Sequence, residues 1–581
     1  AWRTNDAARV RSLTRAFNRF APASLDAGDE NSLTLWSIPF DFCFCDRTLA
    51  AFRDWLKGQY GGSLDRLNAE WRSEFRDWRD VVPLTTAEAR ERHKGDRAYA
   101  AWADHRRYME ISYCGYFASV KRIISEEAPG VRLDMSGTQP PNGYTGMDMW
   151  LLADAIDIAA AYDSDNLAEI MRSFGTPLIK PWYGYGATGP DVGRRAWFDA
   201  FRFRNFGVSF YDGMNFLDPD YTLPKAVTDL QAAVADLRRG GGMLLRRVRE
   251  VPQALIHYSQ ASIHAAAIEG RSEAFLSARS RWCKLLDDAH VPYRFVAYGE
   301  IERGVLREKG CPKILALPQS AALSDREAAE IAAFARRGGL VLGDALSNVM
   351  NEHCTLRPRG GLDGLVAFDL AGATVASLMA QVGAKLPPRE IVLSETPGQG
   401  VRAFVYHPAD GGRDRYLGFV RETYAKGPDV TTVNVSLPGP RHIHDMRRAR
   451  SLGCVPSFEV KLGKAEAAFY AILPEVAGRL ELHLPETVRR GEAVAVTFAL
   501  PGLRFSPVDV TVTDPTGARH PLYSRVVPCM DGRGTRTFQL ALNDRAGTWR
   551  VRAQDFVGGS VAEGTFTVTT NETENEKRGE Q

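Results

Sequence analysis

Short apolar runs alternate with helical patterns over the first 240 or so residues, which is typical of repeated βα units. The chain opens on a helical pattern with apolar residues at Val10, Leu13 and Phe17. Five runs predict strands, each followed by a predicted helix: 23–27, 131–136, 156–162, 177–183 and 207–211. Five units are too few to close an eight-stranded barrel, so we expect the first three βα units to be absent from this sequence, and the alternative is a natural half-barrel.

The helices of this region differ in length and in how they end. Helical patterns cover 46–60, a long stretch at 97–127, and 224–239, and an irregular insertion rich in Trp lies between the first two. Gly240, Gly241 and Gly242 follow the last helix and are interpreted as a linker. The first predicted domain is therefore 1–242, the C-terminal part of a TIM barrel.

Residues 250–388 predict a second α/β domain. Strand-like runs at 254–258, 293–297, 313–318 and 340–343 alternate with helices, and the third run is continuously apolar, as in a buried parallel strand. Ser324 and Glu327 have the spacing of a capping box at the start of the following helix. This order predicts a flavodoxin-like, doubly wound sheet.

The helical period disappears after about residue 390. Alternating strands separated by Pro and Gly predict a small antiparallel β-sandwich over 389–476 and an immunoglobulin-like sandwich over 480–570. The polar segment 571–581 is predicted to be a disordered tail. The fold class is α/β, with a partial (β/α)8 barrel, a second α/β domain and one or two β-sandwiches.

Composition limits the function classes. A formal net charge of +2 argues against a nucleic-acid partner, and no apolar stretch is long enough to span a membrane. The eight cysteines are scattered without a CxxC pair, which argues against a disulfide framework or a complete local zinc motif. Neither a metal nor a cofactor is expected.

Three features together resemble glycoside hydrolase family 42, the β-galactosidases with a trimerisation domain. The first is Gly28-Asp-Glu30, followed by Cys43-Phe-Cys45 and Leu64-Asp-Arg-Leu-Asn-Ala-Glu-Trp71, where that family has an Asn-Glu pair, a Cys-x-Cys-x-x-Cys segment and a Leu-Asn-x-x-Trp turn. The second is the segment 313–343, similar to the trimerisation domain, and the third is the order of the domains. The resemblance implies a divergent, N-terminally truncated hydrolase that assembles as a homo-oligomer, a trimer, and acts on an oligosaccharide or glycoside.

The sequence departs from the family pattern at three positions. Asp29 stands where the family has the Asn beside its acid, and Thr48 stands where it has the third Cys. The strand 177–183 contains no Glu at the place of the nucleophile, and Trp182 occupies about that place. A nucleophile, if there is one, must therefore come from another strand end.

Candidate acids follow the predicted strands, where barrel enzymes place catalytic groups. Glu30 is the first candidate, and the alternative is a loop carboxylate or a helix cap. Asp163 is the preferred partner of Glu30, although Asp163 and Asp165 would also suit a helix cap. Asp212 is a second candidate, and Asp212-Gly213 is also a plain turn signal.

Aromatic residues beside these acids predict substrate contacts. Trp182, Tyr183 and Tyr185 alternate with glycines, and aromatic faces stack on sugars, but a packed barrel rim is an equal alternative. Asp29 and Asp165 complete the predicted substrate-binding set. The sequence predicts a β-galactosidase-like glycoside hydrolase, and the alternatives are a catalytically impaired carbohydrate-binding protein on the same scaffold or a purely architectural module.

Overall fold

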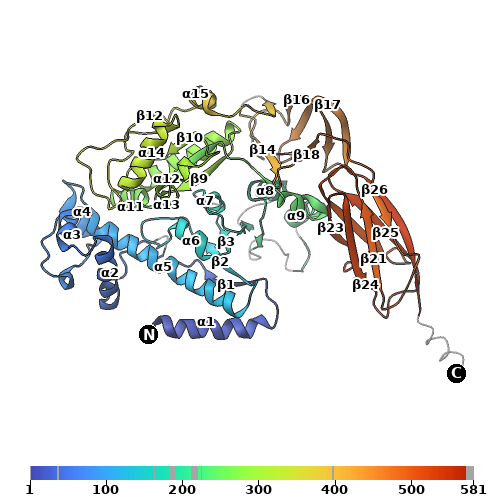
Figure 1. The fold of residues 1–581 in the computed structure, drawn as a ribbon, viewed down its shortest axis with the longest axis horizontal. Coiled ribbons are helices and arrows are strands. Elements are labelled where there is room, and N and C mark those ends of the chain that lie inside the picture. Colours follow the sequence, from blue (N-terminus) through green and yellow to red (C-terminus); the bar gives the residue numbers. More distant parts are fainter. Residues whose placement is uncertain are drawn as a thin grey trace. The chain divides into compact units, whose positions relative to one another are not determined.

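A computed structural model describes residues 2–35, 38–162, 164–183, 190–210, 220–223, 225–395 and 398–570. The chain forms two compact units (Figure 1). The first comprises Ala1–Tyr183, Phe206–Tyr211 and Pro252–Pro387, and the second comprises Gly184–Asn205, Asp212–Val251 and Pro388–Gln581. The fold is α/β with additional β-sheets, which agrees with the predicted class.

The first unit begins with a parallel sheet in the order β1-β2-β3-β4. Strands occur in all five predicted runs: β1 (Ser24–Asp29), β2 (Arg132–Thr138), β3 (Ile158–Ala161), β4 (Leu178–Ile179), β5 (Trp182–Tyr183) and β6 (Ser209–Phe210). The run 177–183 is divided into β4 and β5 around Pro181, which has no N–H to donate to a neighbouring strand. β5 pairs with β6 in parallel.

Helices accompany these strands, with α1 lying along α5 (Figure 1). Arg15 of α1 forms an ion pair with Glu127 at the end of α5, with Nε and Oε2 2.6 Å apart. Their bounds are α1 (Trp2–Asn18), α2 (Asp46–Gln59), α3 (Leu64–Trp71), α4 (Thr86–His93), α5 (Ala100–Glu127), α6 (Met149–Ala155) and α7 (Leu167–Ser173).

The Trp-rich insertion is more regular than predicted. The segment expected to be a Leu-Asn-x-x-Trp turn is the helix α3, capped by the Ser63 side chain, and α4 begins with a capping box of Thr85 and Glu88. Both caps satisfy amides that the first turn leaves free. The Thr-x-x-Glu spacing was present in the sequence and is the signal that the prediction missed.

A buried cluster around Asp104 of α5 holds this insertion. Its Oδ2 accepts hydrogen bonds from the Tyr60 hydroxyl at 2.6 Å and from Trp71 Nε1 at 2.8 Å. Its Oδ1 lies 2.5 Å from His353 Nδ1. Burial disfavours the charged imidazole, but the Asp104 carboxylate outweighs this effect and raises the pKa of His353 to about 9.

This pair predicts a loss of stability in alkali. The folded-state pKa of His353 lies above its ordinary value of 6.5, so its stabilisation is complete below about pH 6.5 and is lost as pH rises through about 9. Over this pH range the unchanged protein should lose on the order of 2 kcal/mol of unfolding free energy, and we expect His353→Gln to abolish this loss. Urea unfolding of the first unit at pH 6, 7.5 and 9 measures it, and equal pH slopes for both proteins would contradict it.

The second sheet of this unit is fully parallel, in the order β12-β11-β10-β8-β9. Ser324 and Glu327 form the predicted capping box of α14. The elements are β8 (Ala254–Tyr258), β9 (Tyr293–Ala297), β10 (Ile314–Leu317), β11 (Leu340–Gly343), β12 (Leu365–Ala367), α11 (Gln260–Ile268), α12 (Ser272–Asp288), α13 (Tyr298–Glu302), α14 (Asp325–Arg336) and α15 (Val375–Val382).

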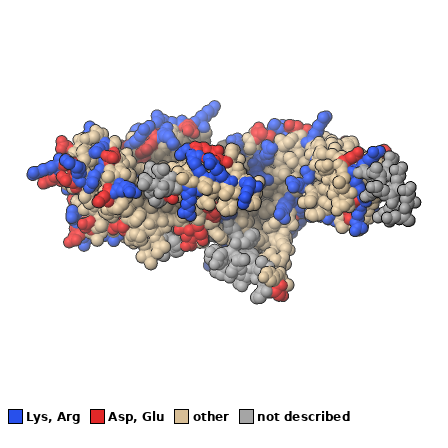
Figure 2. Space-filling model, turned by 90° about the horizontal axis from the view of Figure 1, so that it is seen from below, with Lys and Arg blue, Asp and Glu red and all other residues tan. Residues whose placement is uncertain are grey.

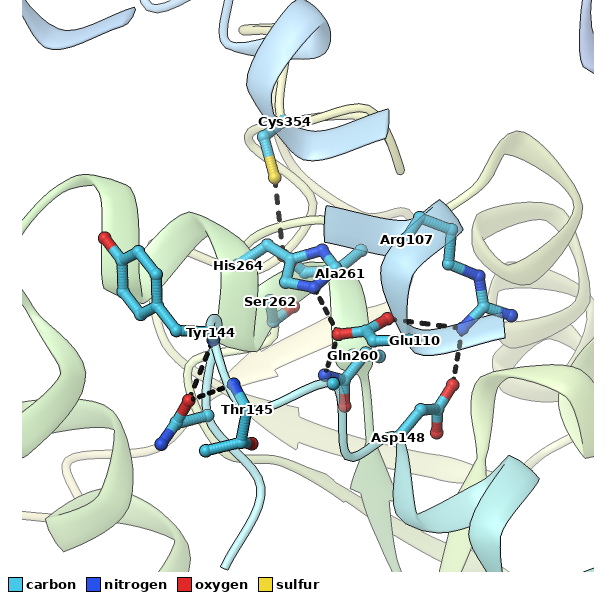
Figure 3. A network of polar contacts seen from close by, with 12 residues as sticks. Arg107, Glu110, Tyr144, Thr145, Asp148, Gln260, Ala261, Ser262, His264 and Cys354 are labelled. Atoms are coloured by element: carbon cyan, nitrogen blue, oxygen red, sulfur yellow. Dashed lines mark hydrogen bonds and ion pairs between the residues drawn. The ribbon is translucent and has the colours of Figure 1, made fainter. Parts of the chain in front are cut away.

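A buried polar network joins α5 to the elements around this second sheet (Figure 3). Arg107 NH1 lies 2.5 Å from Asp148 Oδ2, and Glu110 Oε1 lies 2.6 Å from His264 Nε2 of α11. Gln260 Nε2 also donates to Glu110 Oε1, at 2.5 Å. Because these partners are more than 40 residues apart in sequence, their contacts fix one packing arrangement of the two parts.

The second unit consists mainly of two β-sheets. The first runs β13-β16-β18-β15-β14-β7, with β17 paired to β16. Its strands are β7 (Val248–Arg249), β13 (Val392–Ser394), β14 (Val401–Pro408), β15 (Arg415–Arg421), β16 (Val430–Asp445), β17 (Arg450–Gly463) and β18 (Ala467–Leu473). The helices α8 (Pro190–Phe203), α9 (Lys225–Asp236) and α10 (Gly242–Leu245) belong to this unit. The Tyr406 hydroxyl of β14 donates to Phe201 O of α8 at 2.6 Å.

The second sheet of this unit has the order β19-β21-β24-β23-β22-β25-β26-β20. Alternate residues of its long strands are buried, as in β25, where Trp549, Val551 and Ala553 point into the core. The strands are β19 (Glu481–His483), β20 (Thr487–Arg489), β21 (Ala493–Ala499), β22 (Phe505–Thr513), β23 (Arg525–Met530), β24 (Arg533–Gln539), β25 (Gly547–Asp555) and β26 (Val561–Thr569).

The predicted glycine linker is wrong. Gly240 and Gly241 are buried at a kink between α9 and α10, where the backbone of Gly240 is not helical. A Cβ at Gly240 would lie 2.7 Å from the Phe556 side chain, so this position needs glycine for a close approach. Consecutive glycines in a sequence do not distinguish a linker from a tightly packed helix junction.

The charge distribution agrees with a nearly neutral chain. Acidic and basic side chains are interspersed with uncharged residues over much of the face in Figure 2. No helix in the described part of the chain is long and apolar enough to cross a membrane.

Candidate functional site

Glu30 stands immediately after β1, at the carboxyl edge of the parallel sheet. Its backbone has a φ of 50°, and its N–H donates to Ser136 O of β2 at 3.2 Å. The side chain is exposed. A carboxyl group on this edge is in the position where parallel α/β enzymes place reacting groups.

Two aromatic residues lie beside Glu30. The hydroxyl of Tyr162, which follows β3, donates to Glu30 Oε1 at 2.7 Å. The Tyr162 ring stacks on Trp182 with a centroid distance of 6.3 Å and an interplanar angle of 20°. Trp182 is half-buried, and its Nε1 donates to Ala160 O at 3.0 Å. The carboxyl group and the two rings therefore form one continuous group across three strands.

Polar side chains also pair across neighbouring strands of this sheet. Lys180 forms an ion pair with Asp134 of β2, and the Ser136 hydroxyl donates to Asp26 of β1. Burial raises the pKa of Asp134, and the Lys180 ammonium opposes this shift.

Asp29 and Gly137 show how tightly the edge is built. Partial burial, and next the negative charge of Glu30, raise the pKa of Asp29. Gly137 is the penultimate residue of β2 and has a φ of +57°, and a Cβ there would collide with Asp29 Oδ1 and lie 2.9 Å from the backbone N of Glu30. The position of Glu30 therefore depends on a glycine in the neighbouring strand.

We expect Gly137→Ala to lower the unfolding free energy of the first unit by about 2–4 kcal/mol, because it adds a steric collision to left-handed backbone strain. Gly130→Ala is the matched control, since Gly130 also has a positive φ, +91°, but nothing lies within 4 Å of its Cβ position. This control should cost about 1–2 kcal/mol. Urea unfolding measures both, and equal losses would show that the collision is relieved.

Three predicted site residues, Asp163, Asp212 and Tyr185, lie outside the described residues. Asp165 is half-buried with a φ of 52°, and its carbonyl accepts a hydrogen bond from Arg279 NH2 at 2.7 Å. The cap alternative does not apply to it, because Asn166 is the N-cap residue of α7. Tyr183 is fully buried, which favours the packing alternative over stacking on a sugar.

Sequence reasoning did not name Tyr162 or Asp134 as members of this group. Tyr162 was the last residue of a predicted strand. Because every second side chain of a strand points to the same face, its spacing from Ile158 and Ala160 could have placed all three on one face of the sheet. Asp134 sits inside a predicted strand, where a carboxylate is unusual and calls for a partner. That partner, Lys180, could not be known without the strand order.

In the described part of the chain, no three His, Cys, Asp or Glu side chains come together as a possible metal site. All eight cysteines are free thiols. The Thr48 hydroxyl oxygen lies 3.3 Å from Cys45 Sγ. Thr48 stands where the family has its third cysteine.

Comparison with known proteins gives one family. The model of the glycoside hydrolase family 42 β-galactosidases matches residues 28–169, the segment that begins at Gly28 and contains Glu30 and Tyr162. The chain is similar to family 42 glycoside hydrolases. The family 42 resemblance stated from the sequence is thus confirmed.

Two curated relatives show the extent of this similarity. Beta-galactosidase Pbg of Clostridium perfringens is 24% identical over 136 residues, which are 23% of this chain and 19% of the relative. Beta-galactosidase BgaP of Planococcus sp. is 27% identical over 196 residues, 29% of each chain. The chain thus matches well under two thirds of the length of either relative.

Solved structures with this fold cover more of the chain. The β-galactosidase from Bacillus circulans sp. alkalophilus matches with a TM-score of 0.61 and 14% identity, over 81% of this chain and 82% of that one. The apo family 42 exo-carrageenase from Bacteroides ovatus matches with a TM-score of 0.54 and 14% identity, over 77% and 65%. At these identities the likeness concerns the fold alone.

Proposed function

We propose that the chain acts as a glycoside hydrolase on a β-galactoside-like bond, with Glu30 as the acid that assists departure of the leaving group. The observation that carries the proposal is the position of Glu30: an exposed carboxyl group at the carboxyl edge of the sheet, held by Tyr162 at 2.7 Å, within the segment matched by the family model. The β-galactoside class comes from the names of the relatives.

The chemistry needs a second carboxyl group. The acid protonates the glycosidic oxygen, while the other carboxylate either attacks the anomeric carbon or activates a water molecule. We assign Asp163 this second role, with Asp212 as the other candidate. Asp163 directly follows Tyr162, whose contact with Glu30 supports a location of this strand end beside the acid. Asp163→Asn should then abolish turnover while leaving sugar binding measurable.

The same edge supplies the substrate contacts of the proposed site. Trp182 offers a half-buried indole stacked on Tyr162, which suits the C–H face of a sugar ring. Asp29, Asp165 and Tyr185 keep their proposed roles as substrate contacts, whereas Tyr183 supports the sheet from a buried position.

We also infer the architecture around the site. Strands β1 to β6 correspond to the C-terminal part of an eight-stranded barrel, and the sheet of β8 to β12 to the family's flavodoxin-like trimerisation domain. Self-association through 250–388 stays a proposal, which sedimentation at micromolar concentration tests.

Hydrolysis of an alkyl β-galactoside, measured by the galactose that is released, tests the function directly. Turnover that disappears in Glu30→Gln supports the proposal. Stabilisation of the protein by galactose without any turnover would overturn it in favour of a carbohydrate-binding protein. Neither turnover nor stabilisation would leave an architectural module.

A further inference from the structure

A cavity of about 240 Å³ lies at the carboxyl edge of the second parallel sheet. Residues that follow three strands of this sheet line it: Gln260 after β8, Tyr298 after β9 and Ser324 after β10. Side chains of α2 and α5 also line it, and all of these elements belong to the first unit. Glu30 is not one of the lining residues, so the cavity is separate from the proposed hydrolytic site.

The strand order places this cavity where the chain reverses its direction across the sheet. β9 pairs with one side of β8 and β10 pairs with the other, so the order reverses between β8 and β10. Open α/β sheets bind their ligands at such a point, in the crevice outside the carboxyl ends of the strands. The topology of the second sheet therefore predicts a ligand at the place where the cavity lies.

The helices that begin at this crevice are capped by their own side chains. The Ser259 hydroxyl accepts from the Ser262 amide at 3.0 Å in α11, and the Ser324 hydroxyl accepts from the Glu327 amide at 3.1 Å in α14. Glu327 Oε2 accepts from the Ser324 amide at 2.8 Å. Anions bind at helix N-termini through uncapped amides, so these caps and the Glu327 carboxylate disfavour a phosphate or nucleotide.

The charges around the cavity favour a cation. Four carboxylates line it: Asp104, Glu302, Glu327 and Glu352. Each basic lining residue of the described chain is already paired with an acid: Arg107 with Asp148, His264 with Glu110 and His353 with Asp104. Glu327 is likewise paired with His257, at 3.0 Å. The Glu302 and Glu352 carboxylates therefore leave unneutralised negative charge in the cavity.

Three side chains keep hydrogen-bond acceptors that no described residue occupies. Glu302 Oε1 accepts from the Ser324 hydroxyl at 2.5 Å, which leaves Oε2, and both oxygens of the exposed Glu352 remain. The His264 side chain is only 2% exposed, and its Nε2 lies 2.6 Å from Glu110 Oε1. The tautomer that donates to Glu110 leaves Nδ1 of this buried ring as an acceptor. The cavity thus lacks donors.

We propose that this cavity binds a small organic ammonium ion, a primary amine on a short carbon chain. The ammonium group supplies the donors and the positive charge that Glu302 and Glu352 lack. The half-buried indole of Trp55, which also lines the cavity, suits the carbon chain, and aromatic rings attract organic cations. Pockets for drug-sized ligands measure about 300–1,000 Å³, so a cavity of about 240 Å³ takes a smaller molecule.

Calorimetric titration of the full chain with putrescine tests this site. One molecule should bind per chain, and more weakly as the NaCl concentration rises. 1,4-Butanediol has the same carbon chain with hydroxyl groups in place of the ammonium groups, and it should bind at least about tenfold more weakly. Glu30→Gln should bind putrescine as the unchanged protein does, which makes the result independent of the proposed hydrolysis.

Charge-neutralising variants locate the bound amine. Glu302→Gln keeps an acceptor for the Ser324 hydroxyl, and Glu352→Gln removes no hydrogen bond between described residues, so both should fold. Each should weaken putrescine binding about tenfold. Glu308→Gln is the matched control, because Glu308 is exposed in the same unit and does not line the cavity, and it should bind normally.

Three outcomes would refute the amine site. Equal affinities for putrescine and 1,4-butanediol would show a neutral polar cavity. No heat of binding at millimolar putrescine, or binding that Glu302→Gln and Glu352→Gln both retain, would show that the amine does not occupy this cavity. Displacement of putrescine by an equimolar amount of Mg²⁺ at constant ionic strength would show a metal site instead.

Discussion

Glu30→Gln is expected to reduce hydrolysis of an alkyl β-galactoside by about 10²–10⁴-fold, the range that a positioned general acid contributes. The amide keeps the size of the side chain and can still accept the hydrogen bond that Tyr162 donates at 2.7 Å. It cannot give a proton to the departing oxygen. The loss should therefore appear in turnover with little effect on the stability of the sheet edge.

The leaving group distinguishes an acid from a merely structural carboxylate. A dinitrophenolate leaves without protonation, so the variant should lose much less activity on a dinitrophenyl β-galactoside than on the alkyl compound. Equal losses on both substrates would indicate damage to the site, and no loss would remove Glu30 as the acid. Glu126→Gln, on an exposed carboxylate at the end of α5, is the control and should keep full activity.

Local patterns were enough to predict the elements that position the site. Strands occur in all five predicted runs, and the Ser324 capping box begins α14 as expected. Hydrophobic periodicity does not predict a helix start that is set by one residue with a non-helical backbone. The long helix begins at Ala100 and not at Arg97, because Arg97 has a φ of 49° and the Tyr99 amide donates to Cys354 O. That acceptor is distant in sequence, so no local signal predicts this helix start.

The candidate site shows the same division between local and long-range information. Glu30 could be found from its own neighbours, Gly28 and Asp29, after a predicted strand. Tyr162 and the Asp134–Lys180 pair could not, because their contacts depend on which strands are adjacent. The local sequence predicts that Glu30 stands at the end of a strand, whereas its hydrogen-bond partner Tyr162 follows only from the order of the strands in the sheet.

Asp148→Ala is expected to have the largest effect on stability, about 3–5 kcal/mol, because it removes one partner of a buried ion pair. Asp148 is fully buried, 2.5 Å from Arg107 NH1, and accepts a hydrogen bond from the Tyr298 hydroxyl at 2.6 Å. Burial raises the pKa of Asp148, and the Arg107 guanidinium opposes that shift. The variant leaves this guanidinium with the Glu110 carboxylate, whose Oε2 is 3.6 Å away, and with the Tyr298 hydroxyl, to which its NH2 donates at 2.7 Å.

The same substitution also removes the cap of α6, since Asp148 Oδ1 accepts from the Trp150 amide at 3.0 Å. Asp148→Asn keeps an acceptor for that amide but not the charge, so it should cost less than Asp148→Ala. Glu126→Ala, which breaks an exposed ion pair, should cost less than about 1 kcal/mol. Hydrogen exchange of the α5 and α6 amides in the three variants measures the stability of the first unit separately from that of the second. Losses below about 1 kcal/mol for Asp148→Ala would mean that the network of Figure 3 does not join α5 to the second sheet energetically.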